Sequence, residues 1–292
     1  MGFIGMGLKI ITDNMKLIGY TVVYNEEALV PYVLPYIVRM GYDKFVIFDD
    51  GCTDNTIEAL SNGLSEHGIN FEVRPTVVNN PDYDFDGRKR DSMVAGIHEC
   101  TAIVNENGGE SVWMTFTDFD EVIYCTRERE EQLKGYLELM DKRGFNFFDG
   151  RMLHLTWDEK ERNEKALPHQ WEGVRGTWWL SEGGKVTLFK VNDFASITAF
   201  CANHHMGVRM ANGKRPKDLS LTGEFQGFHL KYFSKTALDT KPARLYGSSS
   251  ERLVNEVRFN SFPLDMFFLF NGFCAGRIPA DDKYLGEGLF LM

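Results

Sequence analysis

Acidic side chains follow three apolar runs of this 292-residue sequence, at points where strands are expected to end. The three motifs are Tyr24-Asn25-Glu26, Asp49-Asp50 and Asp118-Phe119-Asp120. Crowded carboxylates repel one another unless a cation, or the hydrogen-bond donors of a ligand, offset their charge. A hard divalent cation carrying a diphosphate would do so, with Asp120 on the metal. Because each motif alone is also an ordinary turn sequence, its chemistry depends on the elements that position it.

These elements alternate between strands and helices. Apolar, β-rich runs predict strands at 16–24, 45–48, 71–78 and 111–116. Helices are predicted at 28–40, where two prolines favour a kink or a late start, from a cap at Thr53 to about 66, and at 88–102. This order predicts an α/β fold with a doubly wound, mostly parallel sheet and helices on both faces. Ligands bind such sheets beyond the carboxyl ends of the strands, which makes the three acidic motifs neighbours.

Composition excludes several classes of protein. The net charge is −10, from 32 basic and 42 acidic residues, which argues against a nucleic-acid partner. The five cysteines are scattered without a C-x-x-C pair, so we expect neither a disulfide framework nor a structural zinc site, and a reducing, cytoplasmic location. We find no signal peptide and no apolar run of about 18 residues, so we expect no transmembrane segment. An oligomer is compatible with this composition.

Three runs occur in a fixed order: VVYNEE (Val22–Glu27), FDDGCTDNT (Phe48–Thr56) and WMTFTDFDEVIY (Trp113–Tyr124). Together, and with their spacing, they resemble the nucleotide-sugar-binding half of family 2-like glycosyltransferases with the GT-A fold. The resemblance covers about residues 16–125. It implies a GT-A type sheet, a nucleotide diphosphate sugar donor, foremost a UDP-sugar, and Mn²⁺ or Mg²⁺ as cofactor.

The resemblance also implies roles for individual residues on the donor side. Tyr24 and the strand before it would line the base pocket, and Asp50 would accept the N3–H of a uracil-type ring. Arg90, preferred to Arg88, would lie near the base or the phosphates, although both also fit exposed charges at a helix start. The donor-binding residues expected are Val22, Tyr24, Glu26, Asp50, Arg90, Asp118 and Phe119.

The expected metal ligands are the Asp-x-Asp carboxylates and a later histidine. Asp118 would approach both the ribose and the metal, and Asp120 would ligate it, with Glu121 supporting the site without touching the ion. Of the histidines, His205 is chosen over its neighbour His204 as the third ligand. A weaker resemblance at Leu230–Gly247, to the HY-x-x-KS segment of a subgroup of these enzymes, leaves His229 as the alternative.

The second half carries the acceptor side with fewer signals. A strand is predicted over Phe145–Trp157, and a carboxylate must deprotonate the attacking hydroxyl if the reaction inverts. Its candidates are Asp158, Glu172 and Glu182, of which the first two are preferred. Trp171, Trp178 and Trp179 either stack on sugars or pack in the core. A further strand is predicted at 185–191, and core packing is the default for the aromatic stretch at 262–273.

We therefore expect a single domain over residues 1–292, with a nucleotide-sugar-binding half at about 16–125 and an acceptor-binding half with C-terminal helices at about 126–292. Its function would be metal-dependent, inverting transfer of a sugar to the hydroxyl of a glycan or other acceptor. A nucleotidyltransferase is an alternative, but it would usually show a glycine-rich phosphate loop where VVYNEE stands. A non-catalytic nucleotide-sugar-binding module is a second alternative, which would keep Asp50 and need no base.

Overall fold

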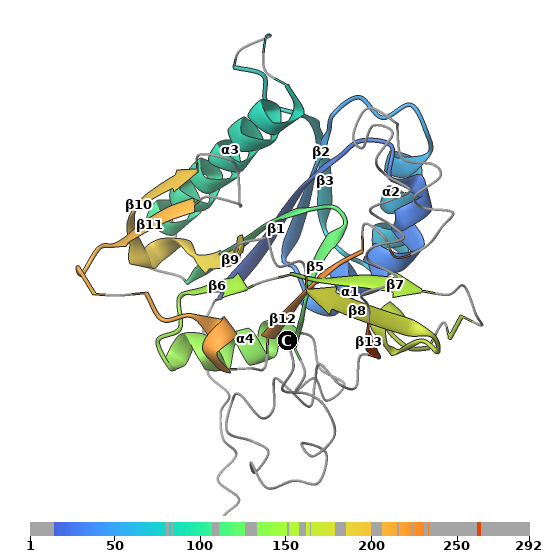
Figure 1. Ribbon diagram of the computed structural model, residues 1–292. Helices are drawn as coiled ribbons and strands as arrows, with labels where there is room; N and C mark the ends of the chain where they lie inside the picture. Colours follow the sequence, from blue (N-terminus) through green and yellow to red (C-terminus); the bar gives the residue numbers. More distant parts are fainter. Residues whose placement is uncertain are drawn as a thin grey trace, which may run out of the picture.

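The computed structural model describes residues 15–79, 82, 84–106, 111–125, 133–150, 152–157, 162–163, 165–178, 185–199, 206–214, 216–222, 225–230, 233 and 262–263. Within these residues two larger sheets and a separate strand pair are present, with helices packed around the first sheet (Figure 1). None of the described helices is long and apolar enough to cross a membrane.

The first sheet has six strands in the order β3-β2-β1-β4-β9-β6. They are β1 (Lys16–Val23), β2 (Lys44–Asp49), β3 (Phe71–Pro75), β4 (Val112–Asp118), β6 (Phe147–Gly150) and β9 (Lys185–Lys190). Strands β3, β2, β1 and β4 run parallel to one another, whereas β9 is antiparallel to both β4 and β6. The prediction of an α/β fold with a mostly parallel sheet is confirmed.

Helices cover both faces of this sheet (Figure 1). They are α1 (Val30–Met40), α2 (Thr56–Glu66), α3 (Phe85–Glu106) and α4 (Leu133–Lys142), with short 3-10 helices at Glu27–Leu29, Pro168–Gln170, Val191–Asp193 and Leu219–Thr222. Apolar side chains of α1 and α2 form one core with β1, β2 and the second sheet, and those of α3 form another on the opposite face. The late start expected of the first helix is confirmed, because the 3-10 turn precedes α1; Gly41, at a positive φ of 72°, ends it.

The second sheet has the order β13-β8-β7-β12-β5. Its strands are β5 (Glu121–Cys125), β7 (Met152–Trp157), β8 (Val174–Trp178), β12 (Phe225–His229) and β13 (Phe262–Pro263). The antiparallel pair β10 (Phe194–Ala199) and β11 (Met206–Met210) lies beside α3 (Figure 1). Since β5 follows β4 after a two-residue turn, Asp118-Phe119-Asp120 lies at the junction of the two large sheets.

Helix α3 lies unusually close to the sheet at Gly96. A Cβ atom added there would lie 2.9 Å from Met114 Cε and 3.1 Å from ring atoms of Tyr20, a fully buried side chain. The terminal methyl of Met114 can move aside, but the ring of Tyr20 is fully buried, so a larger residue would have to displace that ring or the helix by a few tenths of an ångström. Glycine at this position therefore lets α3 pack closely on Tyr20 of β1.

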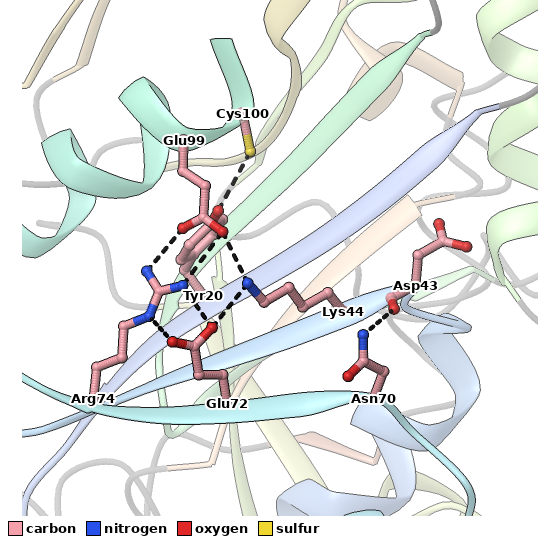
Figure 2. Close-up of polar contacts among 8 residues, drawn as sticks. All are labelled: Tyr20, Asp43, Lys44, Asn70, Glu72, Arg74, Glu99 and Cys100. Carbon is pink, nitrogen blue, oxygen red and sulfur yellow. Dashed lines mark hydrogen bonds and ion pairs between the residues drawn. The ribbon is translucent and has the colours of Figure 1, made fainter. Parts of the chain in front are cut away.

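A network of four charged side chains joins α3 to the outer strands of the sheet (Figure 2). Lys44 of β2 lies 2.9 Å from carboxylate oxygens of both Glu72 and Glu99. Arg74 of β3 completes the network, at 2.5 Å from Glu72 and 2.8 Å from Glu99. Two cations thus face two anions, and all four side chains are between 24% and 42% exposed.

Two expectations about local structure are wrong. Phe145–Trp157 is not one strand, because β6 pairs with β9 in the first sheet while β7 belongs to the second sheet. The chain changes sheets after Gly150, where a Cβ atom would collide with the ring of Phe148. Thr53 does not cap α2: its N–H donates to Asn25 Oδ1, and the helix begins at Thr56, whose N–H donates to Asp54.

The bounds of one helix and one strand differ modestly from the prediction. Helix α3 begins three residues before the expected start and ends four residues after the expected end, and β3 ends at Pro75 rather than at 78. Of the aromatic C-terminal stretch, only Phe262–Pro263 lies within the described residues, and it pairs with β8. The C-terminal helices expected there lie outside the described residues.

Candidate active site

The three acidic motifs lie together at one edge of the first sheet. In the strand register Val22 of β1 lies opposite Asp118 of β4, and Val23 lies opposite Asp49 of β2. All three motifs therefore follow carboxyl ends of adjacent parallel strands, where α/β sheets bind ligands. This arrangement was predicted from the sequence.

The loops after β1 and β2 are fastened to each other by hydrogen bonds. Asn25 Oδ1 accepts the N–H of Thr53 at 2.7 Å, and the N–H of Glu26 donates to Thr56 Oγ1 at 2.7 Å. Asn25 adopts a positive φ of 53°, a conformation that asparagine tolerates better than most residues. Tyr24 and Glu26 are half-buried at this edge, so both can face a ligand in the way predicted for the donor.

Two of the residues expected to contact the donor have buried side chains instead. Val22 packs in the core formed with α3, and Phe119 packs in the core formed with α1. They are 4% and 3% exposed, respectively. Burying an apolar side chain in the core is favourable in free energy, whereas exposing it to a ligand site at the sheet edge leaves it in contact with water.

Asp50 is held by Arg88 across the edge of the sheet. Arg88 Nε donates to Asp50 Oδ1 at 2.6 Å and its NH2 group donates to Asp50 Oδ2 at 2.7 Å, a bidentate pair. Thr76 also donates to the same carboxylate at 3.0 Å, and the Asp50 side chain is only 2% exposed. The basic residue beside Asp50 is thus Arg88, whereas Arg90, the preferred choice, contacts its neighbour Asp91 at 3.3 Å.

Asp118 forms an ion pair with a buried lysine of α3. Lys89 Nζ lies 2.5 Å from Asp118 Oδ1, and the lysine is 3% exposed. Burial alone would raise the pKa of Asp118, but the positive charges of Lys89 and Lys185 outweigh burial and lower this pKa. Asp118 is therefore an ionised carboxylate with a resident counter-ion.

Asp120, Glu121 and His229 form a compact cluster that could hold a metal ion. Their potential ligand atoms all lie within 4.8 Å of one another, and all three residues are buried. His229 Nε2 lies 3.5 Å from Asp120 Oδ1, and β12 places His229 opposite Glu121 of β5. Burial lowers the pKa of His229 to about 4, so the imidazole is neutral near pH 7 and keeps a lone pair for a metal.

The surroundings of this cluster determine which ligands are accessible. Lys185 of β9 makes a short contact with Glu121, and both side chains are almost completely buried. Burial and the charge of Asp118 raise the pKa of Glu121, against the opposing effect of Lys185. The ring centroids of His154, on β7, and His229 lie 4.6 Å apart, so a second imidazole borders the cluster. Carboxylate oxygen and imidazole nitrogen suit Mn²⁺, so Asp120 and His229 fit a metal directly, while Glu121 is already paired.

The other predicted site residues do not join this cluster in the described structure. His205, His204, Asp158 and Glu182 lie outside the described residues. Glu172 is exposed after the 3-10 turn, and its carbonyl accepts the indole N–H of Trp157 at 3.1 Å. Trp171 is 7% exposed and packs edge-on against Trp157, which favours a core role over sugar stacking.

Sequence reasoning missed both lysines of the site and underrated His229. Lys89 stands in a run of basic residues, Arg88-Lys89-Arg90, of which only Lys89 is buried. Its signal is the spacing to Met93, Gly96 and Cys100, which places it on the buried face of α3. Lys185 opens β9, a strand that also ends in a lysine, and nothing in this short sequence indicates which acid Lys185 meets.

The chain was compared with known proteins. No family model matches it, and no curated protein matches it. Among solved structures it is similar to residues 1–349 of S. aureus TarS in complex with UDP. The two are 18% identical, the match covers 51% of this chain and 38% of that chain, and the TM-score is 0.33. A second is Mycobacterium tuberculosis glucosyl-3-phosphoglycerate synthase with Mn²⁺, UDP and phosphoglyceric acid, at 17% identity, 46% and 42% coverage and a TM-score of 0.29.

A third similar structure is core-mannan synthase A from Aspergillus fumigatus in its Mn/GDP form. It is 9% identical, with 62% of this chain and 61% of that chain covered and a TM-score of 0.31. The matches thus span between 38% and 61% of these three solved chains. Because the TM-scores are low, the function of this chain is inferred below from its own residues.

Proposed function

We propose that this chain is a GT-A type, metal-dependent glycosyltransferase that moves a sugar from a nucleotide diphosphate sugar to an acceptor hydroxyl. One observation carries the proposal: Asp118 and Asp120 follow a parallel strand beside the Asp50–Arg88 pair, and Asp120 meets His229 at 3.5 Å. A base pocket and an ion site thus lie along one sheet edge. The order of the VVYNEE, FDDGCTDNT and WMTFTDFDEVIY runs supports the same assignment.

The edge between β1 and β2 would bind the base of the donor. Tyr24 and Glu26 flank it, and the fastened loops hold it in place before the ligand arrives. Asp50 already accepts hydrogen bonds from Arg88 and Thr76, and a carboxylate has further lone pairs for an imide N–H. A uracil ring offers that N–H, so a UDP-sugar is the donor proposed first.

Asp120 and His229 would hold the divalent ion, with Asp118 beside them. His229 here takes the role expected of His205. When bound, Mn²⁺ or Mg²⁺ would neutralise charge that builds on the departing diphosphate. The chain's own residues would position this chemistry: the ring of His154 packs beside that of His229, and Asp120 and Glu121 are buried.

The second sheet would supply the acceptor side and the base for an inverting reaction. Asp158 follows β7 directly in the sequence, and β7 carries His154 next to the ion site, so Asp158 is preferred. Glu172 is exposed and lies against Trp157 through its backbone, and it is the second choice. A glycan or another hydroxyl compound is the acceptor class proposed.

The test is hydrolysis of a panel of UDP- and GDP-sugars by the purified chain, with and without Mn²⁺. Slow release of the sugar that needs Mn²⁺ and disappears in Asp120→Asn supports the proposal. Pyrophosphate release from a nucleoside triphosphate and a sugar phosphate would point instead to a nucleotidyltransferase. Nucleotide-sugar binding without any turnover, in the presence of a panel of hydroxyl acceptors, would indicate a non-catalytic module.

A further inference from the structure

The candidate site contains its own cations. Three acidic side chains, Asp118, Asp120 and Glu121, lie at the junction of the sheets, and two lysines lie against them. Lys89 pairs with Asp118 and Lys185 pairs with Glu121, while the neutral His229 faces Asp120. Within the described residues, the two lysines thus offset the negative charge of two of the three acids without a metal ion.

The two lysine pairs differ in their access to a ligand. Lys185 and Glu121 have side chains 3% and 0% exposed, so this pair is enclosed between the sheets. Lys89 is 4% exposed, but its partner Asp118 is 26% exposed. The Lys89–Asp118 pair therefore borders the edge where the diphosphate would bind, and the Lys185–Glu121 pair does not.

A divalent ion and the Lys89 ammonium compete for Asp118. Both are cations, and both would have to approach the same carboxylate, where their mutual repulsion opposes binding of the ion. Lysine is a compact charge on a flexible four-carbon stem, so its ammonium can exchange one oxygen partner for another nearby. Phosphate oxygens of a nucleoside diphosphate are the partner that arrives with the ion.

We propose that Lys89 is a diphosphate-contacting residue, which holds Asp118 in the resting protein and turns to the diphosphate when donor and ion bind together. This role rests on the function proposed above. It makes the ion and the nucleotide bind cooperatively, because the nucleotide takes up the cation that the metal displaces. Lys185 keeps its contact with Glu121 throughout.

The test is binding of Mn²⁺ and of UDP to Lys89→Met, which keeps the length of the side chain and removes its charge. The affinity for Mn²⁺ without nucleotide is obtained from the free Mn²⁺ signal in electron paramagnetic resonance. The affinity for UDP is measured by calorimetry in a buffer that contains Mn²⁺. Mn²⁺ alone should bind about tenfold tighter or more, and UDP about tenfold weaker or more, since a coupling between two sites is commonly of this size. A loss of fold would weaken both, so opposite signs distinguish the proposed role.

Lys44→Met is the matched control. Lys44 also pairs with a carboxylate of α3, through Glu99, but lies in the balanced network of Figure 2. Both affinities should stay at the wild-type values. Should Lys89→Met leave Mn²⁺ binding unchanged or weaken it while UDP still binds, the Lys89 role is refuted and the proposed function stands. Should neither UDP nor GDP bind the wild-type chain, both proposals fail.

A second measurement covers the case in which Lys89→Met does not fold. A structure of the wild-type chain with UDP and Mn²⁺ should show Lys89 Nζ within hydrogen-bond distance of a diphosphate oxygen. An ammonium that remains on Asp118 with both ligands bound would overturn the proposal.

Discussion

Helix α3 contributes to two charged clusters that differ in their balance of charge and in their burial. Around Glu99, two cations and two anions are matched and partly exposed (Figure 2). Around Lys89, three acidic groups meet two lysines, and nearly all of them are buried. Exposed ion pairs contribute little to stability, whereas unmatched buried charges are costly and tend to occur where a ligand binds. The comparison favours a small contribution to stability for the first cluster and supports the ligand-binding role proposed above for the second.

The largest effect should follow from breaking the enclosed pair at the binding site. Lys185→Met leaves Glu121 buried without its cation, and we expect the free energy of unfolding to fall by about 3–5 kcal/mol. Urea denaturation monitored by circular dichroism measures this change. The double variant with Glu121→Gln should recover part of the loss. Equal stability of wild type and Lys185→Met would place this pair in the same class as the exposed network.

Asp120→Asn should remove ion binding and transfer while the fold persists. Asparagine keeps the size of the side chain but supplies no negative charge to a divalent ion, so we expect a loss of about 100-fold or more in turnover. Turnover is measured at several Mn²⁺ concentrations. Glu99→Gln, the same kind of change in the exposed network, is the control and should keep wild-type turnover. An active Asp120→Asn variant with unaltered Mn²⁺ dependence would contradict the site assignment.

Asp50→Ala should weaken the nucleotide rather than the ion. Removing the carboxylate leaves Arg88 without its bidentate partner and the base without an acceptor, and UDP should bind about tenfold more weakly, equivalent to about 1.4 kcal/mol. Calorimetry with UDP and titration with Mn²⁺ alone separate the two affinities. Unchanged UDP affinity together with lower turnover would move Asp50 out of the base pocket.

The smallest effect concerns pH and the exposed network. Hydrogen bonds from Arg74 and then Lys44 lower the pKa of Glu72 to about 2, against an ordinary value of 4.5. A lowered carboxyl pKa stabilises the fold above the unfolded-state value, and this stabilisation is lost as the pH falls from there toward 2. The urea midpoints of wild type and Glu72→Gln should therefore differ slightly at pH 6 and converge toward pH 3. A difference that grows on acidification would have the wrong sign.

The sequence predicts the fold of the first half of the chain well because its patterns are local. Four parallel strands and three helices follow from apolar runs bounded by Gly, Pro and Asp, and parallel topology then brings Asp50 and Asp118 to one edge. The switch from β6 to β7 is marked in the sequence by Asp149-Gly150-Arg151, which interrupts Phe145–Trp157 but gives no indication that β7 joins another sheet. The partners of Lys89 and Lys185 could not be assigned either, because they are distant in sequence: helical spacing places Lys89 on the buried face of α3 but does not indicate which acid it meets.

Gly96 lies on α3 between Lys89 and Glu99, where the helix packs closely against Tyr20 and Met114. A helix is stiff over so short a distance, so any shift of α3 at Gly96 is transmitted to both charged clusters. A methyl group there would press on the Tyr20 ring, and an outward movement of the helix in response would draw Lys89 away from Asp118 and Glu99 away from Arg74 together. The residue at position 96 is thus constrained by its own packing and also by two sets of ion pairs that it does not touch.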